Sequence, residues 1–235
     1  MKLYYETVSE NMLKTLRQLM EIDELSAFRL VGGTSLAMQF GHRTSVDLDL
    51  FAGGYVDITK LLETVRNNFR TDFTLVTKSQ NGISGVIKNI KVDLYDWKVP
   101  FAENPLLIDG IRLATPADIF AYKCEAILDR KSEKDFSDIA EISGHYELGT
   151  LLTTLKLRYP YISTGSIFSI LAKKESIVRD KTIRYSQNNS FEKYATVLRE
   201  KLTAYEQNLQ DQKKIKEEER ASRIQSLIEK KKSGK

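Results

Sequence analysis

Residues 31–51 read VGGTSLAMQFGHRTSVDLDLF. A short strand ending at Val31, followed by a helix over 34–40, would place Gly32-Gly33 at the corner between them. Glycine tolerates positive φ and lets a ligand approach the backbone closely. A helix beginning here would direct unpaired N–H groups and the positive end of its dipole at an anion, with the hydroxyls of Thr34 and Ser35 as further donors. The corner is therefore a candidate phosphate site.

Two carboxylates follow on what reads as the next strand. Because side chains alternate along a strand, Val46, Leu48 and Leu50 are expected to point into a core, and Asp47 and Asp49 to share the other face. Their carboxylates would lie roughly 6–7 Å apart. Two such groups can bind a pair of hard divalent cations, as used for in-line phosphoryl displacement.

A third carboxylate comes from the segment KVDLY over 91–95. Val92 and Leu94 alternate inward there, and Asp93 faces the other way on an expected neighbouring strand. Each short motif alone is more often structural, since Gly-Gly is usually a turn and Asp-x-Asp a solvated pair. No Gly-x-Gly-x-x-Gly or P-loop pattern occurs, so the sequence gives no support for a dinucleotide or P-loop site.

A basic cluster lies on two expected helices downstream. The segment TPAD over 115–118 has a capping threonine, proline at the first helical position and an acid three residues after the cap. The segment SEKD over 132–135 repeats the cap and acid, which predicts a second helix to about Glu141. From composition alone Lys123 and Lys134 are expected on a solvated face, and Asp138 as the i,i+4 partner of Lys134.

Taken in order, these motifs resemble the nucleotidyltransferase toxins of the abortive-infection AbiEii/AbiGii type, minimal members of the DNA polymerase β-like superfamily. The first motif is GGTSLAMQFGHRTSVDLDLF and the second is KVDL at 91–94. The third combines Lys123 and Arg130 with Lys134-Asp135 and Asp138. The resemblance covers residues 28 to 141.

The resemblance implies an enzyme that moves a nucleoside monophosphate from an NTP to an acceptor hydroxyl and releases pyrophosphate. It assigns catalysis to Asp47, Asp49, Asp93 and Lys123, with the three aspartates as ligands of Mg²⁺ or Mn²⁺. Asp93 would hold the catalytic metal and help deprotonate the acceptor. The residues that it implies for nucleotide binding are Gly32, Gly33, Thr34, Ser35, Arg43, Ser45, Lys123, Arg130, Lys134 and Asp135.

The resemblance also implies a toxin of a bacterial toxin–antitoxin or phage-defence system, relieved by a separately encoded antitoxin. The acceptor stays open among tRNA, another RNA, a protein and a small molecule, and neither the NTP nor the oligomeric state follows from the sequence. The alternative is a catalytically inactive nucleotide-binding or antitoxin-interacting module. The presence of all three carboxylates favours the enzyme.

Composition excludes several other classes. Cys124 is the single cysteine, so an intrachain disulfide is impossible and no zinc-ligand cluster exists. The two histidines, His42 and His145, pair with no plausible nucleophile, which argues against triad chemistry. No apolar run is long enough to span a bilayer and the N-terminus lacks a signal-peptide core, so we expect a soluble, cytoplasmic protein without membrane contact.

The 235 residues predict an α+β fold: a short mixed sheet of nucleotidyltransferase type flanked by helices, then a mainly helical C-terminal region. The first helix is expected over 8–22. We expect a nucleotidyltransferase domain over 1–145, a helical region over 146–210 and a charged, helical tail over 211–235. The tail has nine Lys/Arg against five acids, so it could contact RNA phosphates. Its alternative role is a solvated, partly frayed helix.

Overall fold

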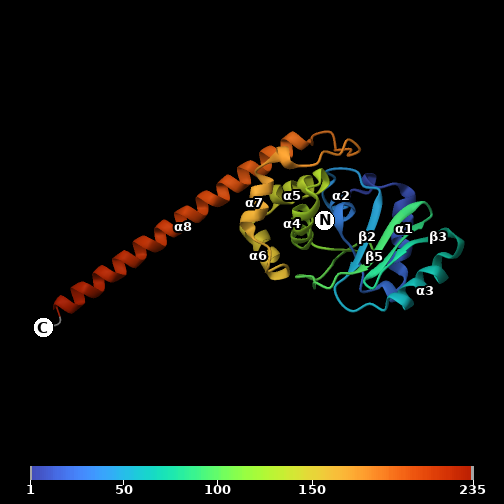
Figure 1. Cartoon of the computed structure of the whole chain (residues 1–235), viewed down its shortest axis with the longest axis horizontal. Helices are drawn as coiled ribbons and strands as arrows, with labels where there is room; N and C mark the ends of the chain where they lie inside the picture. Colours follow the sequence, from blue (N-terminus) through green and yellow to red (C-terminus); the bar gives the residue numbers. More distant parts are fainter. Residues whose placement is uncertain (1, 234–235) are drawn as a thin grey trace.

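The computed structural model describes residues 2–233, which form a seven-stranded mixed sheet with helices on both faces (Figure 1). The strand order is β3-β4-β5-β2-β1-β7-β6. The central pairs β2 with β5 and β1 with β7 are parallel, and the remaining pairs are antiparallel. The strands are β1 (Arg29–Leu30), β2 (Asp47–Ala52), β3 (Phe73–Lys78), β4 (Gly82–Ile87), β5 (Ile90–Asp96), β6 (Leu106–Ile108) and β7 (Ile111–Leu113).

The helices follow the capping signals in the sequence. The α-helices are α1 (Glu10–Glu21), α2 (Gly32–Phe40), α3 (Ile58–Phe69), α4 (Pro116–Arg130), α5 (Glu133–His145), α6 (Leu148–Arg158), α7 (Thr164–Leu171) and α8 (Phe191–Ser233). Short 3₁₀ turns occupy Tyr5–Thr7, Asp23–Leu25, Arg70–Asp72 and Lys174–Ser176. The Thr115 hydroxyl accepts from the N–H of Asp118, and Ser132 accepts from Lys134, so both predicted helix starts are confirmed.

Three boundaries differ from the sequence-based expectation. α5 continues to His145, one turn beyond the predicted end at about Glu141. α2 begins at Gly32 instead of Thr34, because Gly32 adopts φ +66° and turns the chain directly from β1 into the helix. Val46 precedes β2 and is 74% exposed, so the expectation that it points into a core is wrong, whereas Leu48 and Leu50 are fully buried.

The sheet separates two hydrophobic clusters. One face of β2 and β5 packs on α1 and α3 through residues such as Leu16, Leu48 and Val65. The other face contributes Val31 and Phe51 to a cluster shared with the later helices. The carboxylate-bearing face of β2 therefore lies toward α4 and α5.

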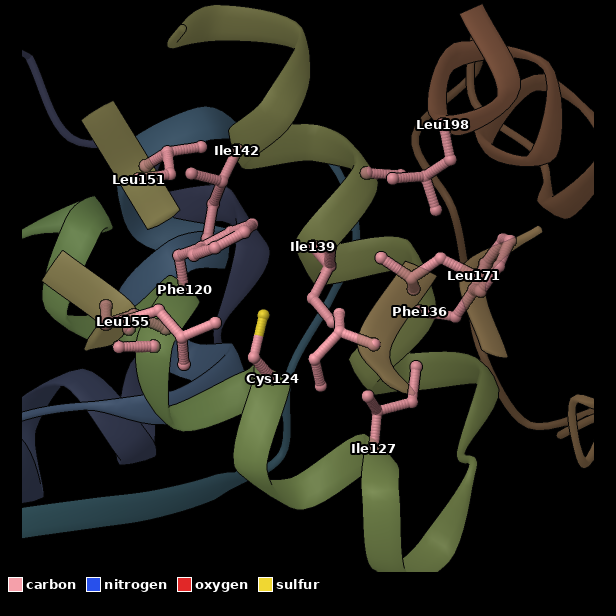
Figure 2. Close-up of a cluster of buried hydrophobic side chains, with 14 of the residues drawn as sticks. Phe120, Cys124, Ile127, Phe136, Ile139, Ile142, Leu151, Leu155, Leu171 and Leu198 are labelled. Atoms are coloured by element: carbon pink, nitrogen blue, oxygen red, sulfur yellow. The ribbon is translucent and has the colours of Figure 1, made fainter. Parts of the chain in front are cut away.

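The second cluster crosses the predicted domain boundary at 145/146. Figure 2 shows Phe120 and Cys124 of α4 beside Ile139 of α5, with Leu155 of α6 and Leu198 of α8 around them. Cys124 is fully buried in this packing, as the apolar pattern of its helix predicts. Helices α4 to α8 thus share one core with one face of the sheet.

Helix α8 leaves this core and extends far from the body (Figure 1). Phe191, Tyr194, Leu198 and Leu202 are buried at its start. Further along, Ile215 and Ile224 are 54% and 48% exposed. The side chains of Leu227 and Ile228 lie outside the described residues. No helix within 2–233 is both long and apolar enough to cross a membrane.

The exposed second half of α8 predicts that it contributes little to folding. A chain ending at residue 210 should keep the melting temperature of the full protein, because residues 211–226 bury no side chain on the body. A chain ending at residue 190 is the contrasting variant. It loses four buried side chains, each worth about 1.5–3 kcal/mol, and should not melt cooperatively. A lowered melting temperature for the first variant would contradict this assignment.

Candidate active site

The three predicted carboxylates come from two adjacent parallel strands. Asp47 and Asp49 lie on β2, Asp93 lies on β5, and Asp49 stands directly opposite Asp93 in the strand register. Neighbouring strands are about 4.8 Å apart, so these two residues are close neighbours on one face. The alternation inferred from the sequence therefore brings the carboxylates together.

The carboxylate of Asp49 lies against the glycine corner. A Cβ atom added at Gly32 would lie 2.7 Å from Oδ2 of Asp49, so the carboxylate sits directly against the glycine backbone. Burial, then repulsion from Asp47 and from Asp93, raises the pKa of Asp49 to about 6. Only glycine allows this approach, and the result is concentrated negative charge at the glycine corner.

The oxygens of Asp93 are in unequal environments. Oδ2 lies 2.8 Å from Nζ of Lys91, while Oδ1 is buried without a hydrogen-bond partner. Within residues 2–233, no three His, Cys, Asp or Glu side chains form a group that could hold a metal by itself. Mg²⁺ usually binds through one or two carboxylates together with waters and substrate phosphates. The unpartnered oxygen and the raised pKa of Asp49 fit a divalent cation whose coordination a phosphate completes.

The hydroxyls expected to contact phosphates face the protein interior. Thr34 is buried and donates to the carbonyl oxygen of Asp47 at 2.5 Å, with Ser45 Oγ at 2.7 Å. Ser35 is buried too, and its Oγ accepts from Nε2 of Gln39. The Thr34 hydroxyl therefore links α2 to β2 and the loop before it, whereas the Ser35 hydroxyl bonds within α2. Of the four corner residues, Gly32 and Gly33 line the cavity.

The predicted basic residues meet in a buried ion-pair network. Arg43 binds Asp138 through two hydrogen bonds of 2.8 and 2.9 Å. Nζ of Lys123 lies 2.8 Å from a carboxylate oxygen of Asp135 and 2.8 Å from one of Asp138. Arg130 donates two hydrogen bonds to Asp135, of 2.6 and 2.9 Å. Burial alone would raise the pKa of Asp138, but Arg43 and Lys123 hold it well below its ordinary value.

This network corrects two expectations from composition. Lys123 is only 4% exposed instead of solvated, because α4 turns it toward α5. Asp138 does not pair with Lys134. It contacts Arg43, Lys123 and Nε2 of His42, and Lys134 instead lies 3.2 Å from Asp180. Nη2 of Arg43 lies so close to Gly33 that a Cβ there would overlap it, which explains the second glycine.

These parts surround a cavity of about 680 Å³. Its walls come from the glycine corner, the loop after α2, the strands β2 and β5, the helix pair α4 and α5, and a segment just before α8. Its lining includes the predicted residues Gly32, Gly33, Arg43, Ser45, Asp47, Asp49, Asp93, Lys123, Arg130, Lys134 and Asp135.

One wall is aromatic, which the sequence analysis missed. Trp97 stacks on Phe51 with ring centres 5.0 Å apart, and Tyr122 meets both rings edge-on. Tyr95 also lines the cavity. A signal for two of these rings was present, since Phe51 and Tyr95 lie two residues beyond Asp49 and Asp93 and so share their faces.

A second missed wall is the segment over 180–184, of which Asp180, Thr182, Ile183 and Arg184 line the cavity. No local motif marks this segment. Its place is set by hydrogen bonds to two distant loops, so periodicity and capping contain no information about it.

Comparison with known proteins agrees with this geometry. Residues 14–102 match the family model described as nucleotidyl transferase AbiEii toxin, type IV TA system. An uncharacterized protein of Aquifex aeolicus is 27% identical over 164 residues, which cover 68% of this chain and 78% of that protein. The resemblance predicted from the motifs is confirmed.

Solved structures share the fold at low sequence identity. A candidate nucleotidyltransferase of H. pylori superposes with a TM-score of 0.56 at 18% identity, covering 86% of this chain and 98% of that one. MenT4, a nucleotidyltransferase toxin of Mycobacterium tuberculosis, gives a TM-score of 0.50 at 13% identity over 80% of each chain. The predicted nucleotidyltransferase fold is confirmed.

The buried network predicts a large stability effect for one of its carboxylates. Asp138→Asn leaves Arg43 and Lys123 without a full counter-charge and should lower the free energy of unfolding by about 3–5 kcal/mol. Denaturant titration measures this loss. Asp129→Asn is the matched control, since Asp129 is an exposed carboxylate of α4 and its substitution should change stability little. Equal effects of the two substitutions would contradict the role of the network.

The raised pKa of Asp49 predicts that removing this charge stabilises the protein at high pH, whereas removing the charge of Asp138 destabilises it. A carboxyl whose folded pKa exceeds its unfolded value favours folding at low pH, and this contribution is lost as the pH rises through about 6. Asp49→Asn should therefore raise stability at pH 8 by about 1–2 kcal/mol. The gain should shrink at pH 5, where Asp49 is itself protonated. Thermal melts at both pH values, with the exposed Asp129→Asn as control, measure it.

Proposed function

We propose, from the match of residues 14–102 to the family of AbiEii nucleotidyltransferase toxins, that this chain transfers a nucleoside monophosphate from an NTP to an acceptor hydroxyl. The observation that carries the proposal is the cluster of Asp47, Asp49 and Asp93 against the glycine corner, inside one cavity. Phosphates placed there would meet backbone N–H groups at the start of α2 on one side and the carboxylates on the other. Release of pyrophosphate would follow in-line attack.

A divalent cation held by the carboxylates would offset the charge of the phosphates and activate the acceptor oxygen. Asp47 and Asp49 supply negative charge from β2. Asp93 supplies a third carboxylate from β5, and its Oδ1 atom, which has no protein hydrogen-bond partner, could bind the same cation. Asp93 would then orient the attacking hydroxyl through that cation.

The basic residues of the cavity could offset the negative charge that develops on the leaving pyrophosphate. Lys123, Arg43 and Arg130 outnumber their two carboxylate partners, so the network keeps one excess positive charge beneath the cavity. Lys134 is 43% exposed and its contact with Asp180 is partly solvated, so exchanging that partner for a phosphate costs little. Developing charge on pyrophosphate would be offset by these groups.

The acceptor and the biological setting belong to this proposal as well. We place the chain in a toxin–antitoxin system in which growth inhibition is relieved by a separately encoded antitoxin. An RNA acceptor, tRNA included, is supported by the exposed cations Lys213, Lys214 and Lys216 on the projecting part of α8. Mg²⁺ is the proposed cation.

Transfer can be tested with NTPs carrying ³²P at either the α or the γ position, incubated with protein, Mg²⁺ and total RNA. We expect α-label in a macromolecule and γ-label in pyrophosphate. Asp93→Asn should lower transfer at least about 100-fold, since it removes the charged oxygens at the attacking group, while Asp129→Asn should retain it.

Two other outcomes would contradict the proposal, in part or as a whole. Undiminished transfer by Asp93→Asn would rule out the role given to Asp93. NTP binding without covalent label, across RNA, protein and small-molecule fractions, would identify the wild-type chain as an inactive nucleotide-binding module and overturn the proposal.

A further inference from the structure

The segment over 177–186 lines the cavity through four residues, Asp180, Thr182, Ile183 and Arg184. It is held at its C-terminal end by the loop after α2. The N–H of Thr44 donates to the carbonyl of Arg184 at 3.0 Å, and the N–H of Ser186 donates to the carbonyl of His42 at 3.0 Å. Arg43 and Tyr185 form an antiparallel bridge between these bonds. The backbone of Arg184 is therefore fixed beside the ion-pair network.

The other end of the segment is held by the start of α5. Val178 exchanges backbone hydrogen bonds with Lys131 and Glu133 at 2.9 and 3.1 Å. The buried carboxylate of Glu133 accepts from the N–H of Asp180, the hydroxyl of Tyr185 and Nε of Arg179. A buried carboxylate with three donors is costly to disrupt, so both ends of the segment are firmly attached.

The cations that line the cavity differ in whether a carboxylate of the protein contacts them. Five of the six that line it have a carboxylate within 4.0 Å: Arg43, Lys91, Lys123, Arg130 and Lys134. The sixth, Arg184, is exposed and forms no ion pair with any of residues 2–233. Arg184 is thus a lining cation whose charge has no internal counterpart.

We propose that the Arg184 guanidinium binds a phosphate of the NTP, which deepens the proposed function and rests on it. Three carboxylates already stand at the cavity floor, so an incoming triphosphate requires cations beyond the paired ones. A guanidinium can bind phosphate through two parallel hydrogen bonds, and it is permanently charged. Attachment of its backbone at both ends lowers the entropy lost on binding.

Nucleotide binding can be followed without any turnover, because Trp97 is the single tryptophan of the chain and lies in the cavity wall. Quenching of its fluorescence by an NTP in the presence of Mg²⁺, checked by calorimetry, gives the affinity. Arg184→Gln should weaken NTP binding about 10–100-fold, as for the loss of a hydrogen-bonded charged pair. Affinity for the corresponding nucleoside, which has no phosphate, should stay the same.

Lys181→Gln is the matched control, because Lys181 is an exposed cation of the same segment that does not line the cavity. It should bind NTP like the wild type, and Arg184→Lys should fall between wild type and Arg184→Gln. All these variants should have the same melting temperature as the wild type, because Arg184 helps to hold the segment only through its backbone carbonyl and not through its side chain.

Three results would overturn the inference in distinguishable ways. Normal NTP affinity in Arg184→Gln, including a case in which only the affinity for an RNA acceptor falls, refutes the NTP contact and leaves the proposed function intact. Equal loss of NTP and nucleoside affinity assigns Arg184 to the shape of the cavity instead. Absence of NTP binding by the wild type, with all four NTPs, refutes the proposed function together with this inference.

Discussion

The arrangement of the active-site region depends on the ion pairs and hydrogen bonds made by the buried carboxylate of Asp138. It joins the loop after α2, through His42 and Arg43, to Lys123 of α4, while its own backbone belongs to α5. Burying these charges is costly, and the cost is offset only when every partner is present. The geometry of the cavity floor is thus tied to one complete network, and the loop that carries Arg43 over Gly33 has its position fixed by it.

The charges around the cavity come from different structural elements. Asp47, Asp49 and Asp93 repel one another on the sheet, and their repulsion together with burial raises the pKa of Asp49 to about 6. Positive charge comes from Lys123 and Arg130 of α4 and from Arg43 of the loop after α2. The carboxylate cluster is therefore destabilising at neutral pH in the absence of a cation, whereas the network stabilises the fold. In a site that binds a metal ion together with a triphosphate, this loss of stability is offset when the metal binds, because the metal supplies the positive charge that the carboxylates lack.

The cavity also extends beyond the part of the chain that the family model matches. The match ends at residue 102 and includes the glycine corner and the three aspartates. Lys123, Asp135 and Asp138 lie beyond it, as does the segment over 180–184. Structural similarity covers more of the chain, since the H. pylori neighbour aligns with 86% of it. The part of the chain from α4 onward thus contributes ten of the 23 residues that line the cavity, and it packs on the sheet through a shared core.

The sequence by itself determined the parts that obey short-range rules. Strand alternation placed Asp47, Asp49 and Asp93 on one face, and the caps at Thr115 and Ser132 located α4 and α5. Tertiary structure alone decided that Thr34 and Ser35 turn inward, that Lys123 is buried, and that Arg184 reaches the cavity. The orientation and burial of these side chains depend on how helices and loops far apart in the sequence pack against one another. The same packing determines which charged groups become ion-pair partners. Local periodicity fixes which face a residue occupies, but not which distant charge that face will meet.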